Sequence, residues 1–172
     1  YPKTANCFRD GSRAVLESFE GSATYVVTNS HTDPVRQKLT SLGAQDDGTC
    51  SLQWLVDRVH GSAKKYVIDE GFTQVDESMA LPGLPRPVWL RRANYYRVLS
   101  QILADEGAGF EDLVVVGDIF ELDLCLPFAM GARVGLLAND FTPEYEKRFL
   151  QSHPRGAVLH SVAEIASFAF GD

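Results

Sequence analysis

Long apolar runs, paired cysteines and clustered positive charge are all scarce in this chain of 172 residues. No apolar run approaches the roughly 20 residues that a membrane-spanning helix needs, so no membrane partner is expected. Acidic residues number 23 and basic residues 16, a net charge of -7, and the basic residues are scattered. Binding to nucleic acid needs clustered Lys and Arg, so that partner is not expected either.

The three cysteines, Cys7, Cys50 and Cys125, do not have the spacing of a metal site or a disulfide framework. This usage favours a reducing, cytoplasmic setting. An apolar content of 45% and a charged content of 23% are ordinary for a globular protein with one core. The sequence therefore predicts a single domain over residues 1–172.

Apolar strand-like runs alternate with amphipathic helical patterns along the chain. Predicted strands are Tyr25–Val27, the run "KKYVIDEG" from residue 64, Leu113–Val116, "ARVGLLA" and "GAVLH". Predicted helices are 33–43, with Asp33 as N-cap, 52–61, 91–107, 122–130, "TPEYEKRFLQSH" and "SVAEIASFAF". Residues 71–89 hold three prolines and are predicted to form a loop. Continuous apolar strands between helices predict an α/β fold with a parallel sheet covered on both faces.

Polar residues follow three of the predicted strands: Thr28-Asn29-Ser30, Asp69, and Gly117-Asp118. Ligands of parallel sheets bind at the carboxyl ends of strands, so these positions are candidates for a site. Glu121 and Asp123 follow Asp118 closely. Clustered hard oxygen ligands suit Mg²⁺, although the same acids are also suited to cap a helix and stabilise its first turn.

The stretch "VVVGDIFELD" resembles the fourth motif of the haloacid dehalogenase-like (HAD) hydrolases, and "YVVTNS" resembles their second motif. "ARVGLLAND" is similar to the strand that follows motif four in that family. The resemblance extends from about Gly21 to Glu164. It implies a three-layer Rossmann-like sheet and a Mg²⁺-dependent phosphohydrolase that acts on a small phosphorylated substrate through an aspartyl-phosphate.

The resemblance also implies roles for individual residues. Thr28 would contact the transferring phosphoryl group as a catalytic residue, and Asn29 and Ser30 would bind substrate. Asp118 would hold Mg²⁺ together with a second acid, for which Asp123 is preferred over Glu121. A cation about 25 residues before the Gly-Asp completes the third motif, with Arg92 preferred over Arg91 and Arg86.

The family's first motif, an apolar strand ending in Asp-x-Asp that supplies the nucleophile, does not precede Thr28. Asp69 resembles it weakly but comes after the second motif. The sequence therefore predicts a sheet without its first strand, in the C-terminal portion of a longer hydrolase whose N-terminal segment or cap domain lies upstream. The alternative is a non-catalytic HAD-like domain for binding or assembly. A methyltransferase of Rossmann type ranks low, because no glycine-rich loop follows a first strand. Substrate identity and oligomeric state are left open.

Overall fold

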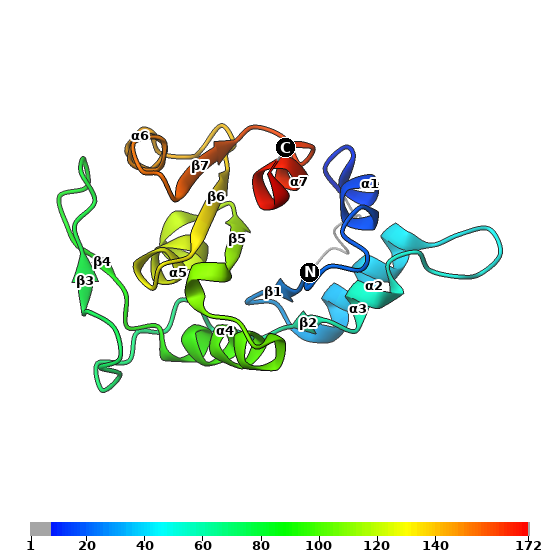
Figure 1. Cartoon of the computed structure of the whole chain (residues 1–172), viewed down its shortest axis with the longest axis horizontal. Coiled ribbons are helices and arrows are strands. Elements are labelled where there is room, and N and C mark those ends of the chain that lie inside the picture. Colours follow the sequence, from blue (N-terminus) through cyan, green and yellow to red (C-terminus); the bar gives the residue numbers. More distant parts are fainter. Residues whose placement is uncertain (1–7, 172) are drawn as a thin grey trace, which may run out of the picture. The chain divides into compact units, whose positions relative to one another are not determined.

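The computed structural model describes residues 8–171, which form two compact units, one up to Ala63 and one from Lys64 onward. Both units contain helices and strands, and the parallel strand pairs among them confirm the predicted mixed α/β class (Figure 1). Of the helices within residues 8–171, none is both long and apolar enough to cross a membrane.

The first unit consists of three helices and one pair of parallel strands. Its elements are α1 (Ser12–Glu17), β1 (Val26–Val27), α2 (Thr32–Gly43), α3 (Gln53–Val56) and β2 (Val59–His60). Val26 pairs with Val59 in the β1–β2 ladder. A small apolar cluster of Leu39, Leu55, Val56 and Val59 joins the helices to the strands. Burial of these side chains supplies the driving force for this unit.

Helix α2 begins one residue before its predicted N-cap, Asp33. The N-cap is His31, whose side chain makes no capping bond. The Thr32 hydroxyl instead accepts a hydrogen bond of 3.1 Å from the amide of Gly61, which directly follows β2. Asp33 lies in the first turn, where a carboxylate still complements the helix dipole.

Two predictions around residue 60 are wrong. The helix predicted over residues 52–61 ends at Val56, because Val59 and His60 pair with β1. The strand predicted from residue 64 is replaced by turns, in which the Val67 amide donates to the carbonyl of Lys64 at 3.0 Å. Tyr66 is 61% exposed, whereas Val59 is 5% exposed. The segment with the buried Val59 became the strand, and a short apolar run by itself does not distinguish the two outcomes.

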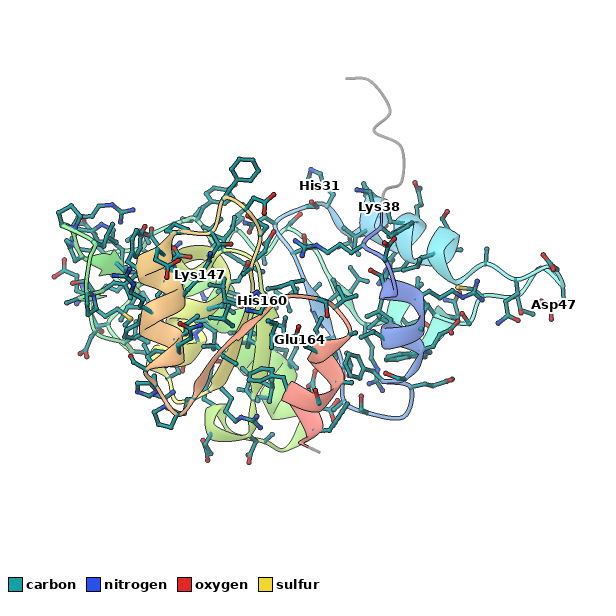
Figure 2. The ribbon with its side chains drawn as sticks, turned by 90° about the horizontal axis from the view of Figure 1, so that it is seen from above. His31, Lys38, Asp47, Lys147, His160 and Glu164 are labelled. Carbon is teal, nitrogen blue, oxygen red and sulfur yellow. The ribbon has the colours of Figure 1, made fainter. Side chains whose placement is uncertain are left out.

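The second unit is built on the parallel sheet β5–β6–β7. Its strands are β5 (Val114–Gly117), β6 (Arg133–Leu137) and β7 (Gly156–Leu159), each close to its predicted range. The helices are α4 (Ala93–Glu106), the short turn η1 (Phe110–Asp112), the π-helical turn η2 (Phe120–Leu124), α5 (Cys125–Ala129), α6 (Glu144–Gln151) and α7 (Glu164–Phe170). At the start of α7, the carboxylate of Glu164 accepts hydrogen bonds of 3.3 Å from the amide of His160 (Figure 2).

Helices cover both faces of the central strand β6. Val134 and Leu136 are fully buried in a core cluster with Phe120, Phe128 and Leu150, which come from η2, α5 and α6. Successive side chains of a strand point to opposite faces, so Gly135 faces the other way. There Phe168 of α7 packs so closely that a Cβ on Gly135 would lie 2.8 Å from its ring.

The segment predicted as a loop over residues 71–89 contains a short antiparallel hairpin. Strands β3 (Ser78–Met79) and β4 (Val88–Trp89) pair Met79 with Val88. Val88 is fully buried in the same core cluster as Leu136, and Leu81 is 2% exposed. The three prolines interrupt the pattern of alternation, which is why the strands escape sequence analysis.

The helix predicted over residues 122–130 begins two residues early as a π-helical turn. This turn, η2, continues into α5 at Cys125. The bond with π spacing joins the Cys125 amide to the carbonyl of Phe120, five residues earlier, whereas the Asp123 amide donates to the carbonyl of Ile119 at the ordinary four-residue spacing. Single π turns occur most often at functional sites, and this one holds two of the acids of the candidate site.

Candidate functional site

The candidate site lies at the carboxyl end of β5, where the strand ends in Gly117 and Asp118. Gly117 pairs with Leu136 of β6, so Asp118 is the first residue beyond the sheet. Its side chain is exposed, and within residues 8–171 no group forms a hydrogen bond or ion pair with its carboxylate. An exposed, uncommitted carboxylate at a strand end is accessible to a cation or a ligand.

Asp123 is held in a different way. Its Oδ1 accepts a hydrogen bond of 2.8 Å from Nζ of Lys65, and its Oδ2 accepts one of 3.2 Å from the amide of Ile119. The side chains of Lys65 and Asp123 are 9% and 16% exposed. A charge-assisted bond in this shielded position is stronger than one in water. The pair therefore fixes Asp123 at one place beside the strand end.

Gly117 makes this arrangement possible. A Cβ on this residue would lie 2.7 Å from Oδ2 of Asp123 and 2.8 Å from its Cγ. Such a separation is well inside van der Waals contact, so any side chain would push the carboxylate of Asp123 away. The glycine in "VVVGD" is needed for the close approach of the Asp123 side chain.

Tyr95, in the first turn of α4, contacts both partners of the ion pair. Its hydroxyl donates a hydrogen bond of 2.8 Å to the main-chain carbonyl of Asp123, and Nζ of Lys65 lies 5.0 Å from its ring centroid. The ring is 1% exposed. Burial, and then the charge of Asp123, raise the pKa of Tyr95 well above its usual range. The hydroxyl therefore stays protonated and remains a donor.

The three arginines considered for the third motif make other contacts. Nη1 of Arg92 donates to the carbonyl of Lys65 at 2.6 Å and its Nε to the carbonyl of Trp89 at 3.0 Å. Nη1 of Arg91 donates to the carbonyl of Glu70 at 3.1 Å. Arg91 and Arg92 thus bond to the main chain, and Arg86 bonds to the side chain of Glu121. The cation in contact with Asp123 is Lys65.

Glu121 is bonded to a different cation, Arg86. Its Oε1 accepts a hydrogen bond of 2.7 Å from Nη2 of Arg86, in the turn between β3 and β4. Glu146 of α6 lies near Glu121 and is 6% exposed. Burial, and then the charge of Glu121, raise the pKa of Glu146, while a hydrogen bond from the Phe120 amide opposes the change. Glu121 and Asp123 thus belong to two separate polar clusters.

Thr28, Asn29 and Ser30 follow β1 in the first unit. The Thr28 amide donates to the carbonyl of His60 at 3.0 Å, and its carbonyl accepts from Ala63 at 2.9 Å. Its hydroxyl accepts a hydrogen bond of 3.1 Å from the Ser30 amide. Thr28 therefore sits at the end of a parallel strand, as predicted, and Asp118 and Asp123 have the equivalent position in the second unit.

The donor chemistry at the end of β5 suits Mg²⁺, which takes one or two carboxylates and completes its shell with water and phosphate oxygens. Asp118 offers both oxygens. Each oxygen of Asp123 accepts one bond and has a further lone pair. Across residues 8–171 no group of three or more His, Cys, Asp or Glu side chains has a geometry that could hold a metal ion. Within the described residues these two acids could supply at most part of the ligand set of a metal ion.

Asp69 does not end a strand. It lies in a turn, where its Oδ1 accepts a hydrogen bond of 3.0 Å from the Gly71 amide and its own amide donates to the carbonyl of Arg91 at 2.9 Å. A nucleophile of the Asp-x-Asp type is presented from the end of an apolar strand. The surroundings of Asp69 therefore differ from those that such a nucleophile needs.

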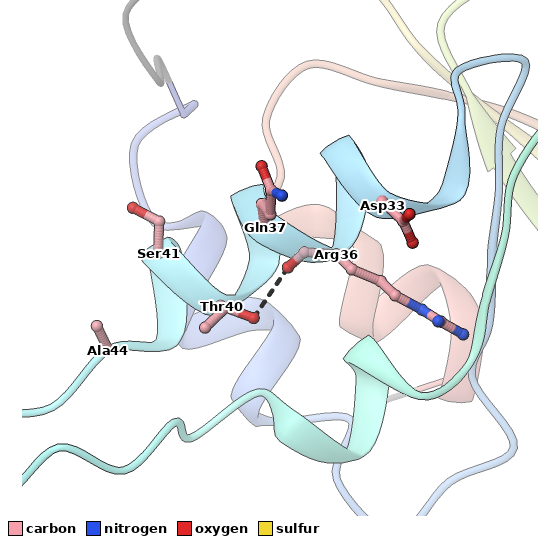
Figure 3. A pocket seen from close by; sticks show the side chains of 6 residues that line it. All are labelled: Asp33, Arg36, Gln37, Thr40, Ser41 and Ala44. Atoms are coloured by element: carbon pink, nitrogen blue, oxygen red, sulfur yellow. Dashed lines mark hydrogen bonds between the residues drawn. The ribbon is translucent and has the colours of Figure 1, made fainter.

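A hollow of about 530 Å³ lies along α2 in the first unit (Figure 3). It is lined by Asp33, Arg36, Gln37, Thr40, Ser41 and Ala44. Nε of Arg36 donates to the carbonyl of Val56 at 3.2 Å, and the Thr40 hydroxyl donates to the carbonyl of Arg36 at 3.0 Å. Two of the lining side chains, Arg36 and Thr40, are thus bonded to the unit's own main chain.

Lys65, the cation in contact with Asp123, is the residue of the candidate site that sequence analysis missed. It stands in "SAKKYV", which resembled the start of a strand, and it is far outside the spacing used to choose Arg92. A lysine before a short apolar run is a weak local signal. Its significance comes from the contact with Asp123, which lies 58 positions later in the chain.

Comparisons of the chain with protein-family models, curated proteins and solved structures give no match. Function is therefore inferred from three features of the second unit: the exposed carboxylate of Asp118, the Lys65–Asp123 ion pair, and the close approach that Gly117 permits.

Proposed function

We propose that this chain carries the magnesium and phosphate-binding side of a phosphohydrolase site of the HAD type. The observation that carries the proposal is the Lys65–Asp123 contact of 2.8 Å, beside an exposed Asp118 at a strand end. A fixed cation among carboxylates stabilises a site that must hold a metal and an anionic phosphoryl group together. In support of the fold, a parallel sheet with helices on both faces is what a three-layer Rossmann-like arrangement requires.

Each residue has a proposed role. Asp118 would hold Mg²⁺, with Asp123 as the second acid, and the bound ion would neutralise charge on the phosphoryl oxygens. Lys65 takes the role for which Arg92 was predicted, because Lys65 is the cation in contact with Asp123. The roles that the resemblance implies for Thr28, Asn29 and Ser30, which follow β1 in the first unit, stay separate predictions. The substrate is a small phosphorylated molecule.

Ion binding tests the proposal without requiring turnover. Mn²⁺, a paramagnetic stand-in for Mg²⁺, is titrated into the 172-residue chain, and broadening of backbone amide signals is followed by NMR. We expect selective broadening at Gly117, Asp118 and Ile119, reversed by excess Mg²⁺. Asp118→Asn should abolish it, and the matched control Asp112→Asn should leave it intact, because Asp112 lies at the opposite end of β5. Equal broadening in Asp118→Asn would contradict the proposal.

A second candidate function is favoured by a different observation. No Asp-x-Asp precedes Thr28 in the sequence, and this motif supplies the family's nucleophile. A non-catalytic HAD-like domain, used for binding or assembly, would not need one. The two candidates differ in the phosphate response. A catalytic site, completed by a nucleophile strand from outside this chain, should bind inorganic phosphate more tightly when Mg²⁺ is present, whereas a purely structural domain should show no such coupling.

A further inference from the structure

One turn of α4 contacts the main chain of both partners of the ion pair. Arg92, the N-cap, donates from Nη1 to the carbonyl of Lys65 at 2.6 Å. Tyr95, three residues on, donates from its hydroxyl to the carbonyl of Asp123 at 2.8 Å. Arg92 immediately precedes α4 and Tyr95 lies in its first turn, so both donors come from the start of the same helix. The carbonyls they reach belong to the two residues whose side chains form the ion pair.

Both donors are buried. Arg92 is 4% exposed and Tyr95 is 1% exposed. Within the described part of the chain, no carboxylate lies within ion-pair distance of the Arg92 guanidinium, whose Nε is bound to the carbonyl of Trp89. Burying an arginine without a carboxylate partner is costly, even though its guanidinium also interacts with the side chain of Cys125. A buried guanidinium at this place is consistent with a role in maintaining the geometry of the Lys65–Asp123 ion pair.

The ring of Tyr95 adds a third contact. Nζ of Lys65 lies 5.0 Å from the ring centroid, within the range of a cation–π interaction. The ammonium is therefore held between the face of Tyr95 and Oδ1 of Asp123. The Lys65 side chain is limited to one position, although lysine side chains are otherwise flexible.

We propose that Arg92 and Tyr95 are positioning residues, which set the Lys65–Asp123 geometry from the first turn of α4 and so align the carboxylates at the end of β5. The importance of this alignment for the ion and phosphate rests on the proposed function. We call these two hydrogen bonds, from Arg92 to the Lys65 carbonyl and from Tyr95 to the Asp123 carbonyl, the clamp. The clamp does not depend on the proposed function. Arg92 thereby acts through Lys65 and does not itself contact substrate.

Two conservative substitutions test the clamp. Tyr95→Phe removes the hydroxyl and retains the ring, and Arg92→Lys retains the charge but loses the paired donors of the guanidinium. Matched controls on the same helix are Tyr96→Phe and Arg97→Lys. Tyr96 stacks with Phe110 and packs at a tilt against Phe72, and Arg97 is exposed and donates to Asn94. If Arg92→Lys does not fold, Tyr95→Phe still tests the proposal, because it removes one hydroxyl group and keeps the buried ring.

The first readout is amide hydrogen exchange at Ile119 and Asp123, compared with amides of the central strand β6. In both variants we expect exchange at Ile119 and Asp123 to accelerate about tenfold relative to β6, because these amides depend on the position of the Asp123 loop. A merely structural role would accelerate all amides together through lower global stability. Uniform acceleration, or no change relative to Tyr96→Phe, would overturn the clamp.

The second readout separates the clamp from the proposed function. Mn²⁺ affinity at Asp118 should fall several-fold in Tyr95→Phe and stay unchanged in Tyr96→Phe. If the wild-type chain shows no Mn²⁺ response at Asp118, the proposed function fails, while the exchange result still decides the clamp. If the wild-type chain binds Mn²⁺ and Tyr95→Phe binds it equally well with local exchange unchanged, the clamp fails and the proposed function stands.

Discussion

Lys65 donates a hydrogen bond of 2.8 Å to Oδ1 of Asp123 across 58 positions of sequence. The ammonium comes from a turn that directly follows the first unit, and the carboxylate from the π-helical turn after β5. Neither side chain is more than 16% exposed. A charge in such a position must be paired, so the two residues depend on each other.

Lys65→Met should destabilise the second unit by about 3 kcal/mol, because it leaves the Asp123 carboxylate shielded and without its cation. Urea unfolding monitored by circular dichroism gives this difference. The control is Lys147→Met on α6 (Figure 2), whose Nζ lies 3.7 Å from the exposed carboxylate of Glu144. A surface pair of this kind contributes less than about 1 kcal/mol. Equal losses in both variants would show that the Lys65–Asp123 pair has no special role in stability.

The order of elements in the second unit was largely predictable from sequence. The apolar runs of β5, β6 and β7 are separated by helices with clear breaks, and Thr142-Pro143 marks the start of α6. Parallel strands that are buried on both faces have continuous apolar runs, and such runs are easily recognised in a sequence. Gly117 and Asp118 were predicted at the end of β5 for the same reason.

Tertiary contacts decided the features that were missed. Strand β2 is two residues long and exists because Val59 pairs with Val26. The equally apolar Tyr66–Ile68 run has no such partner and forms turns. The choice of Arg92 over Lys65 followed spacing along the chain, whereas the contact with Asp123 depends on how distant segments fold together. The spacing of residues along the chain does not predict which distant residues come into contact.

Gly117→Ala should disrupt the site without unfolding the sheet. The added Cβ would lie 2.7 Å from Oδ2 of Asp123, so the carboxylate must move away from the Ile119 amide and from Lys65. Overpacking of this kind costs about 1–3 kcal/mol. Thermal unfolding measures the cost, and Mn²⁺ broadening at Asp118 reports the site. Gly71→Ala is the control, because its Cβ would be 3.3 Å from the nearest side-chain atom. Retention of both properties in Gly117→Ala would refute the close-approach argument.

Glu146→Gln should stabilise the protein at neutral pH more than at acidic pH. Burial and the charge of Glu121 raise the pKa of Glu146 above its model-peptide value of 4.5, so the folded state binds a proton more tightly than the unfolded state. The contribution of Glu146 to the free energy of unfolding therefore falls as pH rises from 4.5 through the raised pKa of the folded state. Glutamine carries no titrating group, so this loss of stability does not occur, and its side-chain oxygen can still accept a hydrogen bond from the Phe120 amide.

Urea midpoints at pH 4 and pH 7 test the effect, with Glu144→Gln on the same helix as the control. The Glu144 side chain is 62% exposed, so its replacement should give a similar shift at both pH values. A gain for Glu146→Gln that is larger at pH 4 than at pH 7 has the wrong sign and would contradict the assignment.

Cys125 should react slowly with thiol reagents in the folded protein. Burial raises its pKa to about 11, although the nearby charge of Arg92 opposes the change, and its Sγ donates to the carbonyl of Glu121. Thiolate is the reactive form, so little is available at pH 7. In a variant carrying Cys7→Ser and Cys50→Ser, a chromogenic disulfide reagent should modify Cys125 only as fast as the protein unfolds. Rapid modification in the absence of denaturant would show an accessible thiol.

The 172-residue chain alone should not hydrolyse an aryl phosphate in the presence of Mg²⁺. No Asp-x-Asp precedes Thr28, and Asp69 lies in a turn with its Oδ1 bound to the Gly71 amide. Without a carboxylate presented from a strand end, the aspartate nucleophile that the resemblance implies is lacking, so no aspartyl-phosphate forms. Release of p-nitrophenol from p-nitrophenyl phosphate, compared with a buffer blank, measures turnover. Mg²⁺-dependent release that is lost in Asp69→Asn but kept in Asp76→Asn would identify Asp69 as the nucleophile and overturn this expectation.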